Sequence, residues 1–320
     1  MSQQNPPIET ETCRYGTDAI ARAADLIRAG DPVAIATETV YGLAGDATSD
    51  SAVARIYAAK GRPSFNPLIV HVSTLEAAAV VAELSPVALA LADAFWPGPL
   101  TMVLPLAPGS PVAPLVTAGL PTVAVRMPAH PAMRALLEAA DRPLAAPSAN
   151  ASGSISPTTA AHVAASLNGR IPLVVDSGPT ARGIESTIIA VGDEGIRLLR
   201  PGPISPDEIA EVAGRPVIAS GSDRIEAPGQ LASHYAPSRP LRLEATERRD
   251  GEWLIGFGAI LGDATLSASG DLVEAAARLF AALHEADASG RAAIAVAPVP
   301  DEGLGLAIND RLHRAAAPRD

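Results

Sequence analysis

Short apolar runs alternate with helical patterns along this chain, and prolines and glycines separate them. Residues 17–29 repeat apolar side chains at the spacing of one helix face and stop at Gly30. The next run, residues 32–36, is short and wholly apolar, as expected of a buried strand. With 320 residues and 48% hydrophobic side chains, this alternation predicts an α/β fold with a large core.

The same patterns predict the other elements and the domain organisation. Helices are expected at residues 17–29, 49–60, 75–83, 86–94, 131–140, 158–167, 271–287 and 304–316, and after the capping box that opens at Ser205. Strands are expected at 32–36, 67–72, 98–106, 121–126, 172–176, 186–191, 196–200, 253–257 and 292–297. Residues 37–43 are expected to form a loop, and the segment around Cys13 an irregular lead-in. We predict a first domain at 1–218, a Gly/Ser/Pro-rich linker at 219–239 and a small α/β domain at 240–320.

Residues 94–125 carry no charge and are long enough to suggest a membrane span. Seven prolines interrupt them, however, and a spanning helix would not tolerate that spacing. We therefore expect strands and loops there. The N-terminus shows no basic, apolar signal sequence, so the protein is expected to be soluble and cytoplasmic, with no membrane partner.

Charge and cysteine content exclude several classes of function. The formal net charge is −11, and acidic residues outnumber basic ones both in 1–219 and in 220–320. This excludes the strongly basic balance of a dedicated nucleic-acid binder. Cys13 is the single cysteine, so neither an internal disulfide nor a cysteine-rich zinc site can form, and we interpret it as a free thiol. The familiar phosphate-loop, dinucleotide, zinc-protease and serine-hydrolase motifs are missing, so any nucleotide must be held in another way.

Lys60 is the only lysine among 24 basic residues. It stands in the segment Lys60-Gly61-Arg62-Pro63, close to Asn66. Lysine offers a compact point charge, whereas arginine offers a flat fork of donors. The segment is therefore suited to gripping phosphate or another small anion. The alternative is an ordinary lysine at a helix end.

Polar residues gather where predicted strands meet loops rather than on helix faces. They include Thr37–Thr39, Tyr41, Lys60, Arg62, Asn66, His71, Arg126, Ser148, Asn150, Glu185–Thr187 and Arg200. In α/β sheets, ligands bind outside the carboxyl ends of strands, which makes this recurrence informative. A catalytic triad that uses His71 stays open, because its partners can be distant in sequence.

These segments resemble the YrdC-like family in its longer, two-domain form, the L-threonylcarbamoyladenylate synthases. The matching motifs are, in order, residues 37–43, 60–63, 66–68, His71, 122–128, 146–150, 156–158, 185–188, 199–202, 228–229, 234–237 and 303–312. The resemblance implies a twisted mixed sheet with a concave active-site cleft, followed by a small Rossmann-like C-terminal domain. Departures are Ala36, where the family more often has proline, the linker start at 227–231, and a short C-terminal unit.

The resemblance also implies a reaction and its partners. Members of the family join L-threonine, bicarbonate or carbon dioxide, and ATP, and they release pyrophosphate. No protein nucleophile is needed, so the protein positions the reactants and neutralises charge. Magnesium would accompany ATP, held mainly by phosphates and water. A tRNA threonylcarbamoyltransferase complex would receive the product, and no stable nucleic-acid binding is expected.

Carried over by matching positions, the resemblance implies three groups of site residues. The expected catalytic cations are Lys60 and Arg62. Threonine would contact Thr39, His71, Arg126, Ala146 and Ser186. ATP would contact Arg62, Asn66, Thr122, Ser148, Ser156 and Arg200, with Tyr235 of the linker closing over the nucleotide as a lid. Alternatively, Thr39 and Ser186 are turn or capping residues and Tyr235 only fixes the linker.

Two other functions stay open. One is an RNA-binding module, since a concave YrdC-like surface could hold nucleic acid, although the acidic balance disfavours it. The other is a related domain that handles carbamoyl adenylate on the same fold. The zinc-finger and acylphosphatase-like segments of those larger proteins are absent from this sequence, and the threonine-pocket match disfavours this interpretation.

Overall fold

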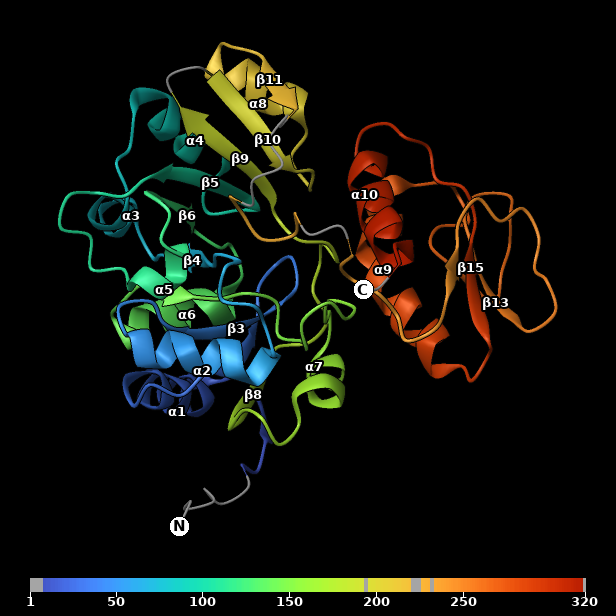
Figure 1. Ribbon diagram of the computed structural model, residues 1–320, viewed down its shortest axis with the longest axis horizontal. Coiled ribbons are helices and arrows are strands. Elements are labelled where there is room, and N and C mark those ends of the chain that lie inside the picture. The colour runs from blue at the N-terminus through green and yellow to red at the C-terminus, as the bar shows by residue number, and fades with distance from the viewer. Residues whose placement is uncertain (1–7, 193–194, 220–225, 231–232, 319–320) are drawn as a thin grey trace.

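The computed structural model describes residues 8–192, 195–219, 226–230 and 233–318. Figure 1 shows two units side by side, a larger one that runs from the N-terminus to β11 and a smaller one at the C-terminal end of the chain. The N-terminal residues 1–7 and parts of the predicted linker, 220–225 and 231–232, lie outside the described residues.

The larger unit is built on a mixed sheet of eleven described strands. In spatial order these are β1 (Glu11–Arg14), β8 (Leu173–Asp176), β2 (Val33–Ala36), β3 (Tyr41–Asp46), β7 (Leu144–Ala145), β4 (Ile69–His71), β6 (Thr122–Arg126), β5 (Leu100–Pro105), β9 (Thr187–Gly192), β10 (Gly195–Arg200) and β11 (Val217–Ala219). The sheet contains both parallel pairs, such as β4–β6, and antiparallel pairs, such as β5–β6. The central strands therefore bring chain segments from distant parts of the sequence next to one another.

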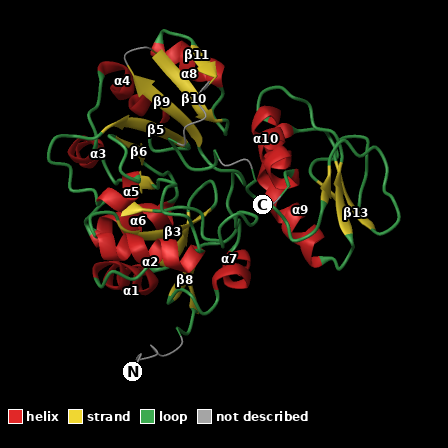
Figure 2. Cartoon of the chain, viewed as in Figure 1, coloured by secondary structure: helices red, strands yellow, loops and turns green. Residues whose placement is uncertain are grey.

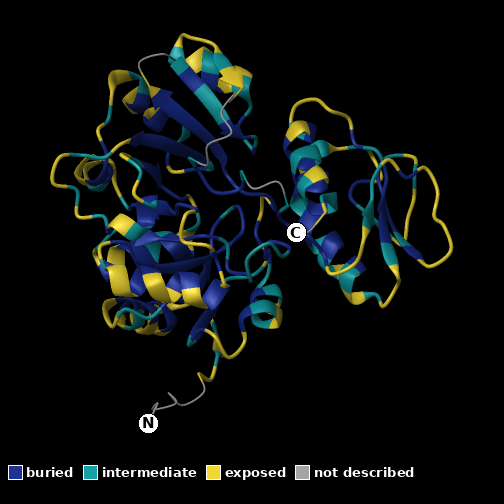
Figure 3. Ribbon diagram, in the orientation of Figure 1, coloured by how far each residue is buried: buried dark blue, intermediate teal, exposed yellow. Residues whose placement is uncertain are grey.

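Helices cover this sheet on both faces (Figure 2). They are α1 (Thr17–Arg28), α2 (Asp50–Lys60), α3 (Leu75–Val81), α4 (Pro86–Phe95), α5 (Pro114–Thr117), α6 (Pro131–Ala140), α7 (Ala160–Leu167) and α8 (Pro206–Ala213). Along β2, Val33 and Ile35 pack into a core with α1 and α6, whereas Ala34 and Ala36 pack into a second core with α2. Because both faces are covered, the strand is apolar throughout, as its sequence predicted. Exposed residues lie on the outer faces of α1 and α2 (Figure 3).

The smaller unit has a sheet of four described strands, all paired in parallel. Their order is β12 (Leu241–Arg242), β15 (Ala293–Val296), β13 (Glu252–Gly256) and β14 (Ala264–Thr265), with α9 (Leu272–Ala288) and α10 (Gly305–Ala316) packed on them. In Figure 1 both helices lie between this sheet and the larger unit. One helix, α9, joins β14 to β15. A small parallel sheet with helices packed on it is the Rossmann-like arrangement expected for this part of the chain.

The two units meet closely along α7, α9 and the loops near residues 156 and 184. His162 of α7 stacks on His284 of α9, with ring centroids 3.8 Å apart, and His284 Nε2 lies 3.1 Å from the carbonyl oxygen of Ser156. A Cβ atom on Gly183 would lie only 2.3 Å from the carbonyl oxygen of Ala277, so this loop rests directly on α9. The smaller unit is thus packed against loops of the larger one.

Two expectations from the sequence were wrong. Residues 37–43 are not all loop, because Tyr41 begins β3 and pairs with Ala36 across a tight antiparallel hairpin. The Thr37 hydroxyl completes the turn by donating to the carbonyl oxygen of Val40 at 2.7 Å. The segment around Cys13 is also not irregular, because it forms β1 and pairs in parallel with β8. Both strands depend on partners that their own short sequences do not reveal.

The uncharged region from 94 to 125 contains β5 and part of β6, as expected, and also the four-residue helix α5, where a loop was expected. Pro114 begins α5, where a missing N–H costs nothing, and Pro105 ends β5. Among the described residues, no helix is both long enough and apolar enough to cross a membrane.

Candidate active site

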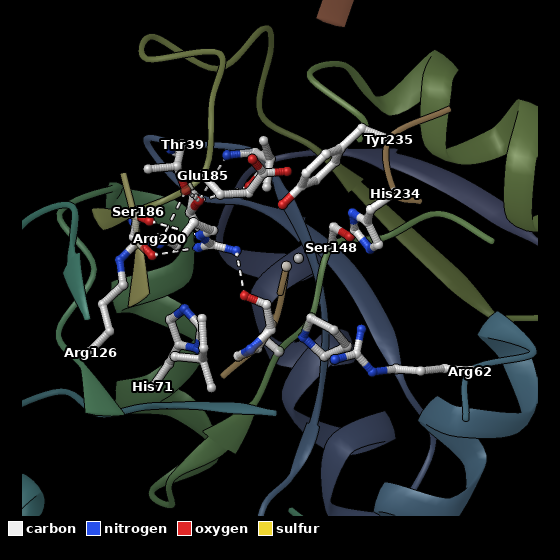
Figure 4. A pocket seen from close by; sticks show the side chains of 18 residues that line it. Thr39, Arg62, His71, Arg126, Ser148, Glu185, Ser186, Arg200, His234 and Tyr235 are labelled. Carbon is white, nitrogen blue, oxygen red and sulfur yellow. Dashed lines mark hydrogen bonds between the residues drawn. The ribbon is translucent and has the colours of Figure 1, made fainter. Parts of the chain in front are cut away.

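One small cavity lies where the central strands of the large sheet end (Figure 4). Its volume is about 40 Å³. The lining residues come from seven segments of the large unit and from the linker: Thr37, Thr39, Val40, Gly42, Arg62, Ile69, His71, Arg126, Ala146, Pro147, Ser148, Glu185, Ser186, Arg200, Pro228, Gly229, His234 and Tyr235. Nine of the thirteen site residues predicted from the sequence are among them.

Arg126 organises one end of the cavity. It closes β6 directly beside His71, its register partner on parallel β4. Its guanidinium donates to Thr39 Oγ1 at 3.1 Å, to Glu38 Oε1 at 2.5 Å and to the carbonyl oxygen of Gly98 at 3.1 Å. Sheet pairing and this set of acceptors fix the position of the guanidinium.

Electrostatics at this end favour a charged Glu38 and a neutral His71. Burial opposes ionisation of Glu38, but the charge and hydrogen bond of Arg126 outweigh it and lower the pKa of the carboxyl. Burial, followed by repulsion from Arg126, lowers the pKa of His71 to about 3, so the imidazole is neutral at physiological pH. His71 Nδ1 has no hydrogen-bond partner among the described residues, so the structure offers no support for a triad.

Ser186 and Arg200 form a second buried group. Ser186 precedes β9, and its hydroxyl lies 2.8 Å from Thr101 Oγ1 on neighbouring β5. Arg200, at the end of β10, donates to Ser186 Oγ at 3.0 Å and to the Ser186 carbonyl oxygen at 3.1 Å. Sequence reasoning missed Thr101; its only signal is a hydroxyl within an otherwise apolar strand.

Arg62 and Lys60 occupy different positions relative to the cavity. Arg62 lines it and donates to the carbonyl oxygens of Asn66 at 3.3 Å and Pro67 at 3.0 Å. Burial lowers the pKa of Arg62 to about 10, which leaves it charged at neutral pH. Lys60 is not among the lining residues. Its ammonium donates to the carbonyl oxygens of Ser148 at 2.5 Å and Asn150 at 2.6 Å, and burial lowers its pKa well below the usual value.

Lys60 and three predicted ATP contacts are not among the lining residues. Asn66 is buried beside Arg62, and its Oδ1 has no hydrogen-bond partner among the described residues. Ser156 is buried and donates to Glu185 Oε1 at 2.5 Å. Thr122 opens β6, four residues before Arg126, and lines a neighbouring hollow with Glu226. The predicted contacts thus extend beyond the cavity into the surrounding strands and loops.

The linker fills much of this space. Figure 4 shows Tyr235 and His234 pointing toward the region of Ser148 and Arg200. Tyr235 is 1% exposed and adopts a left-handed backbone conformation, φ +63°, which is uncommon for a tyrosine. A drug-sized ligand requires a pocket of roughly 300–1,000 Å³. A 40 Å³ cavity therefore has no room for ATP until the linker moves.

Comparison with known proteins identifies the family. Residues 25–202 match the family model described as "Telomere recombination", and residues 204–317 match "Threonylcarbamoyl-AMP synthase, C-terminal domain". The threonylcarbamoyl-AMP synthase of Pyrococcus abyssi is 43% identical over 321 residues, with 93% of this chain and 94% of the relative covered. This chain belongs to the threonylcarbamoyl-AMP synthase family. It is therefore an enzyme of the nucleotidyltransferase type, and the resemblance inferred from its motifs is confirmed.

Two further relatives agree. The Bacillus subtilis threonylcarbamoyl-AMP synthase is 43% identical, with coverage of 94% of this chain and 93% of the relative. The crystal structure of P. abyssi Sua5 complexed with L-threonine superposes with a TM-score of 0.87 at 40% identity, covering 97% of each chain. The expected fold, a YrdC-like mixed sheet with a second α/β unit, is therefore confirmed.

Proposed function

We propose that the cavity beside Arg126 and Arg200 makes threonylcarbamoyl-AMP from L-threonine, bicarbonate and ATP. The observation that carries this proposal is the convergence of three buried arginines, Arg62, Arg126 and Arg200, on one cavity. Buried cations require anionic partners. Arg126 already pairs with Glu38, whereas the printed hydrogen bonds of Arg62 and Arg200 go to carbonyl and hydroxyl oxygens, and the one carboxylate in the described lining, that of Glu185, pairs with Arg311. A carboxylate and a triphosphate would supply the missing negative charge.

The threonine end is assigned to the group around Arg126. The Arg126 fork matches a carboxylate, and Thr39 and Ser186 present hydroxyls to the same space. Neutral His71 and the methyl group of Ala146 would then face the uncharged parts of the amino acid. The solved P. abyssi structure is complexed with L-threonine, which supports L-threonine as a ligand of this fold.

The nucleotide end is assigned to the group around Arg62 and Arg200. Arg62, Arg200 and Ser148 would contact the phosphates first, and Asn66, Thr122 and Ser156 would contact ATP after the linker opens. Arg62 remains the proposed catalytic cation, whereas Lys60, expected beside it, is proposed as a positioning residue. Lys60 would act by holding the loop that presents Ser148, because both of its short hydrogen bonds go to that loop.

A magnesium ion would arrive with ATP. Among the described residues, no three His, Cys, Asp or Glu side chains are grouped to hold a metal. Glu185 Oε1 already accepts from Ser156. These residues therefore do not form a dedicated metal cage, and ATP phosphates and water would supply the ligands.

The proposed chemistry needs positioning more than a protein nucleophile. The threonine amine and bicarbonate form a carbamate and release water. A carbamate oxygen then attacks the α-phosphorus, and the bond to pyrophosphate breaks. The arginines stabilise charge on the departing pyrophosphate, while closure of the linker keeps water from the labile mixed anhydride.

Two wider proposals complete the function. We place the domain boundaries at 218 and 240, since the described part of the first sheet ends at Ala219 and that of the second begins at Leu241.

The product is a reactive anhydride, so an acceptor enzyme must consume it soon after release. We propose a tRNA threonylcarbamoyltransferase complex as that acceptor.

The reaction itself can be tested by measuring pyrophosphate. We expect release from ATP only when L-threonine and bicarbonate are both present. Each single omission serves as the control. Release that is independent of threonine would contradict the proposed reaction, and steeply salt-dependent RNA binding without turnover would favour the RNA-binding alternative.

The lid can be tested at Gly229, which has φ +85° in the linker. A Cβ at this position would lie 2.7 Å from Tyr235 Oη and 2.9 Å from Arg200 Cδ. We expect Gly229→Ala to lower kcat roughly tenfold by preventing closure, since misplacement of a closing lid costs one to two orders of magnitude.

The matched control is Gly258→Ala. Gly258 also has positive φ, at +58°, but a Cβ at this position would have no neighbour within 4 Å among the described residues. It therefore shares the backbone strain without the clash. Equal activity of the two variants would refute a closing role for the linker at this position.

A further inference from the structure

Arg311 of α10 is completely buried where the smaller unit meets the larger one. Its side chain is 0% exposed. Nε donates to Glu185 Oε2 at 3.0 Å, and Nη1 donates to the carbonyl oxygen of Pro201 at 2.8 Å. Nη1 also lies 2.9 Å from Asp310 Oδ2 within α10 itself. Two of the three acceptors thus belong to the larger unit.

These two acceptors flank the residues at the centre of the cavity. Glu185 directly precedes Ser186, and Pro201 directly follows Arg200. Ser186 and Arg200 hydrogen bond to each other at 3.0 Å. One guanidinium therefore joins the chain before β9 to the chain after β10, immediately outside the pair that lines the cavity.

Arg311 also reaches two other parts of the site indirectly. The second oxygen of Glu185 accepts from Ser156 Oγ at 2.5 Å, so the carboxylate is held between the C-terminal arginine and a predicted ATP contact. The Arg311 Cζ atom lies 5.5 Å from the ring centroid of Tyr235. Arg311 itself does not line the cavity.

A buried ion pair of this kind is costly to form and contributes little net stability by itself. A planar fork with fixed donor directions does, however, set the geometry of its acceptors. The tight contact between Gly183 and α9 presses the same loop against the same unit. The arrangement is therefore better suited to fixing the position of the loop than to adding stability.

We propose that Arg311 is a positioning residue through which the C-terminal unit holds Ser186 and Arg200 in their binding geometry. The proposal rests on the assignment of these two residues to threonine and ATP. It gives the smaller unit a role in the first unit's reaction. The enzyme is then complete only with α10 docked, although no residue of α10 lines the described cavity.

The test uses the full-length enzyme with Arg311→Met and Arg311→Lys. Methionine keeps much of the side-chain volume and removes all donors. Lysine keeps the charge opposite Glu185 but cannot reproduce the fork that donates to Glu185 and to the Pro201 carbonyl oxygen together. We expect KM for both L-threonine and ATP to rise about tenfold in Arg311→Met, and by less in Arg311→Lys.

The control is Arg278→Met on α9. Arg278 is 51% exposed and lies 3.5 Å from Glu274 on the same helix. The control therefore makes the same kind of substitution in the same unit, at a residue that takes no part in the contact of Arg311 with Glu185 and Pro201. Its KM values should stay within about twofold of those of the unaltered enzyme, as expected for an exposed ion pair. A purely structural role would lower the melting temperature and the folded fraction but leave both KM values unchanged.

The outcomes are distinguishable. Unchanged KM values in folded Arg311→Met overturn the proposal. If that variant does not fold, Arg311→Lys decides in the same way. Failure of the unaltered enzyme to release pyrophosphate in a threonine-dependent manner would instead refute the proposed function, whatever the variants do.

Discussion

Replacing Lys60 by arginine is expected to lower kcat/KM by about 10²–10³, although the positive charge is kept. The Lys60 side chain is buried, and its ammonium fits between the carbonyl oxygens of Ser148 and Asn150 at 2.5 and 2.6 Å. A guanidinium is larger and flat, so it would displace this loop and with it Ser148. Initial rates of pyrophosphate release, with threonine and bicarbonate present, measure the effect.

Arg55→Lys on the same helix is the control for this exchange. Arg55 is 51% exposed and pairs with Asp31 at the surface, so its replacement should leave the rate within about twofold. A melting curve of Lys60→Arg separates loss of activity from loss of folding. Full activity in Lys60→Arg would show that charge alone matters and that the shape of the cation does not.

Arg126→Lys should produce the second large effect, a rise of about a hundredfold in KM for L-threonine. Truncating one partner of a buried, hydrogen-bonded charge pair costs about 2–5 kcal/mol, and a lysine cannot contact Thr39, Glu38 and a substrate carboxylate together. The ATP KM should change by less than about threefold, because Arg126 lies at the other end of the cavity from Arg62 (Figure 4). Steady-state kinetics in each substrate would show this split.

Arg142→Lys is the matched control for Arg126→Lys. Arg142 pairs with Asp46 at 2.6 Å but is 32% exposed and does not line the cavity. It should leave both KM values unchanged. An equal rise in both KM values for Arg126→Lys would contradict the assignment of Arg126 to the threonine end.

The strand-end residues could be predicted because sheet geometry brings them together. His71 and Arg126 each end a strand, and a parallel pairing makes them register partners. Their motifs also occur in family order, so the matching positions could be transferred one by one. The structure brings them to one cavity, and the role of each residue stays a proposal.

Other features could not be predicted because they depend on contacts between distant segments. Thr101 bonds to Ser186, which lies 85 residues further along the chain, and Arg311 bonds to Glu185 across 126 residues. The two-residue strands β12 and β14 are too short to show any periodicity. Lys60 was expected to face an anion, whereas its described contacts are loop carbonyl oxygens, a difference that only the folded loop can reveal.

Because Tyr235 is buried in the site, the linker competes with ATP for the same space. With the linker residues in its lining, the cavity measures only 40 Å³, so ATP binds only to the fraction of molecules in which the linker has moved aside. The apparent Kd for ATP equals the intrinsic Kd divided by that fraction, so a linker that is out about 1% of the time weakens apparent affinity about a hundredfold. Any change that loosens the linker should therefore tighten ATP binding while it removes the cover over the product, so affinity and turnover would respond in opposite directions.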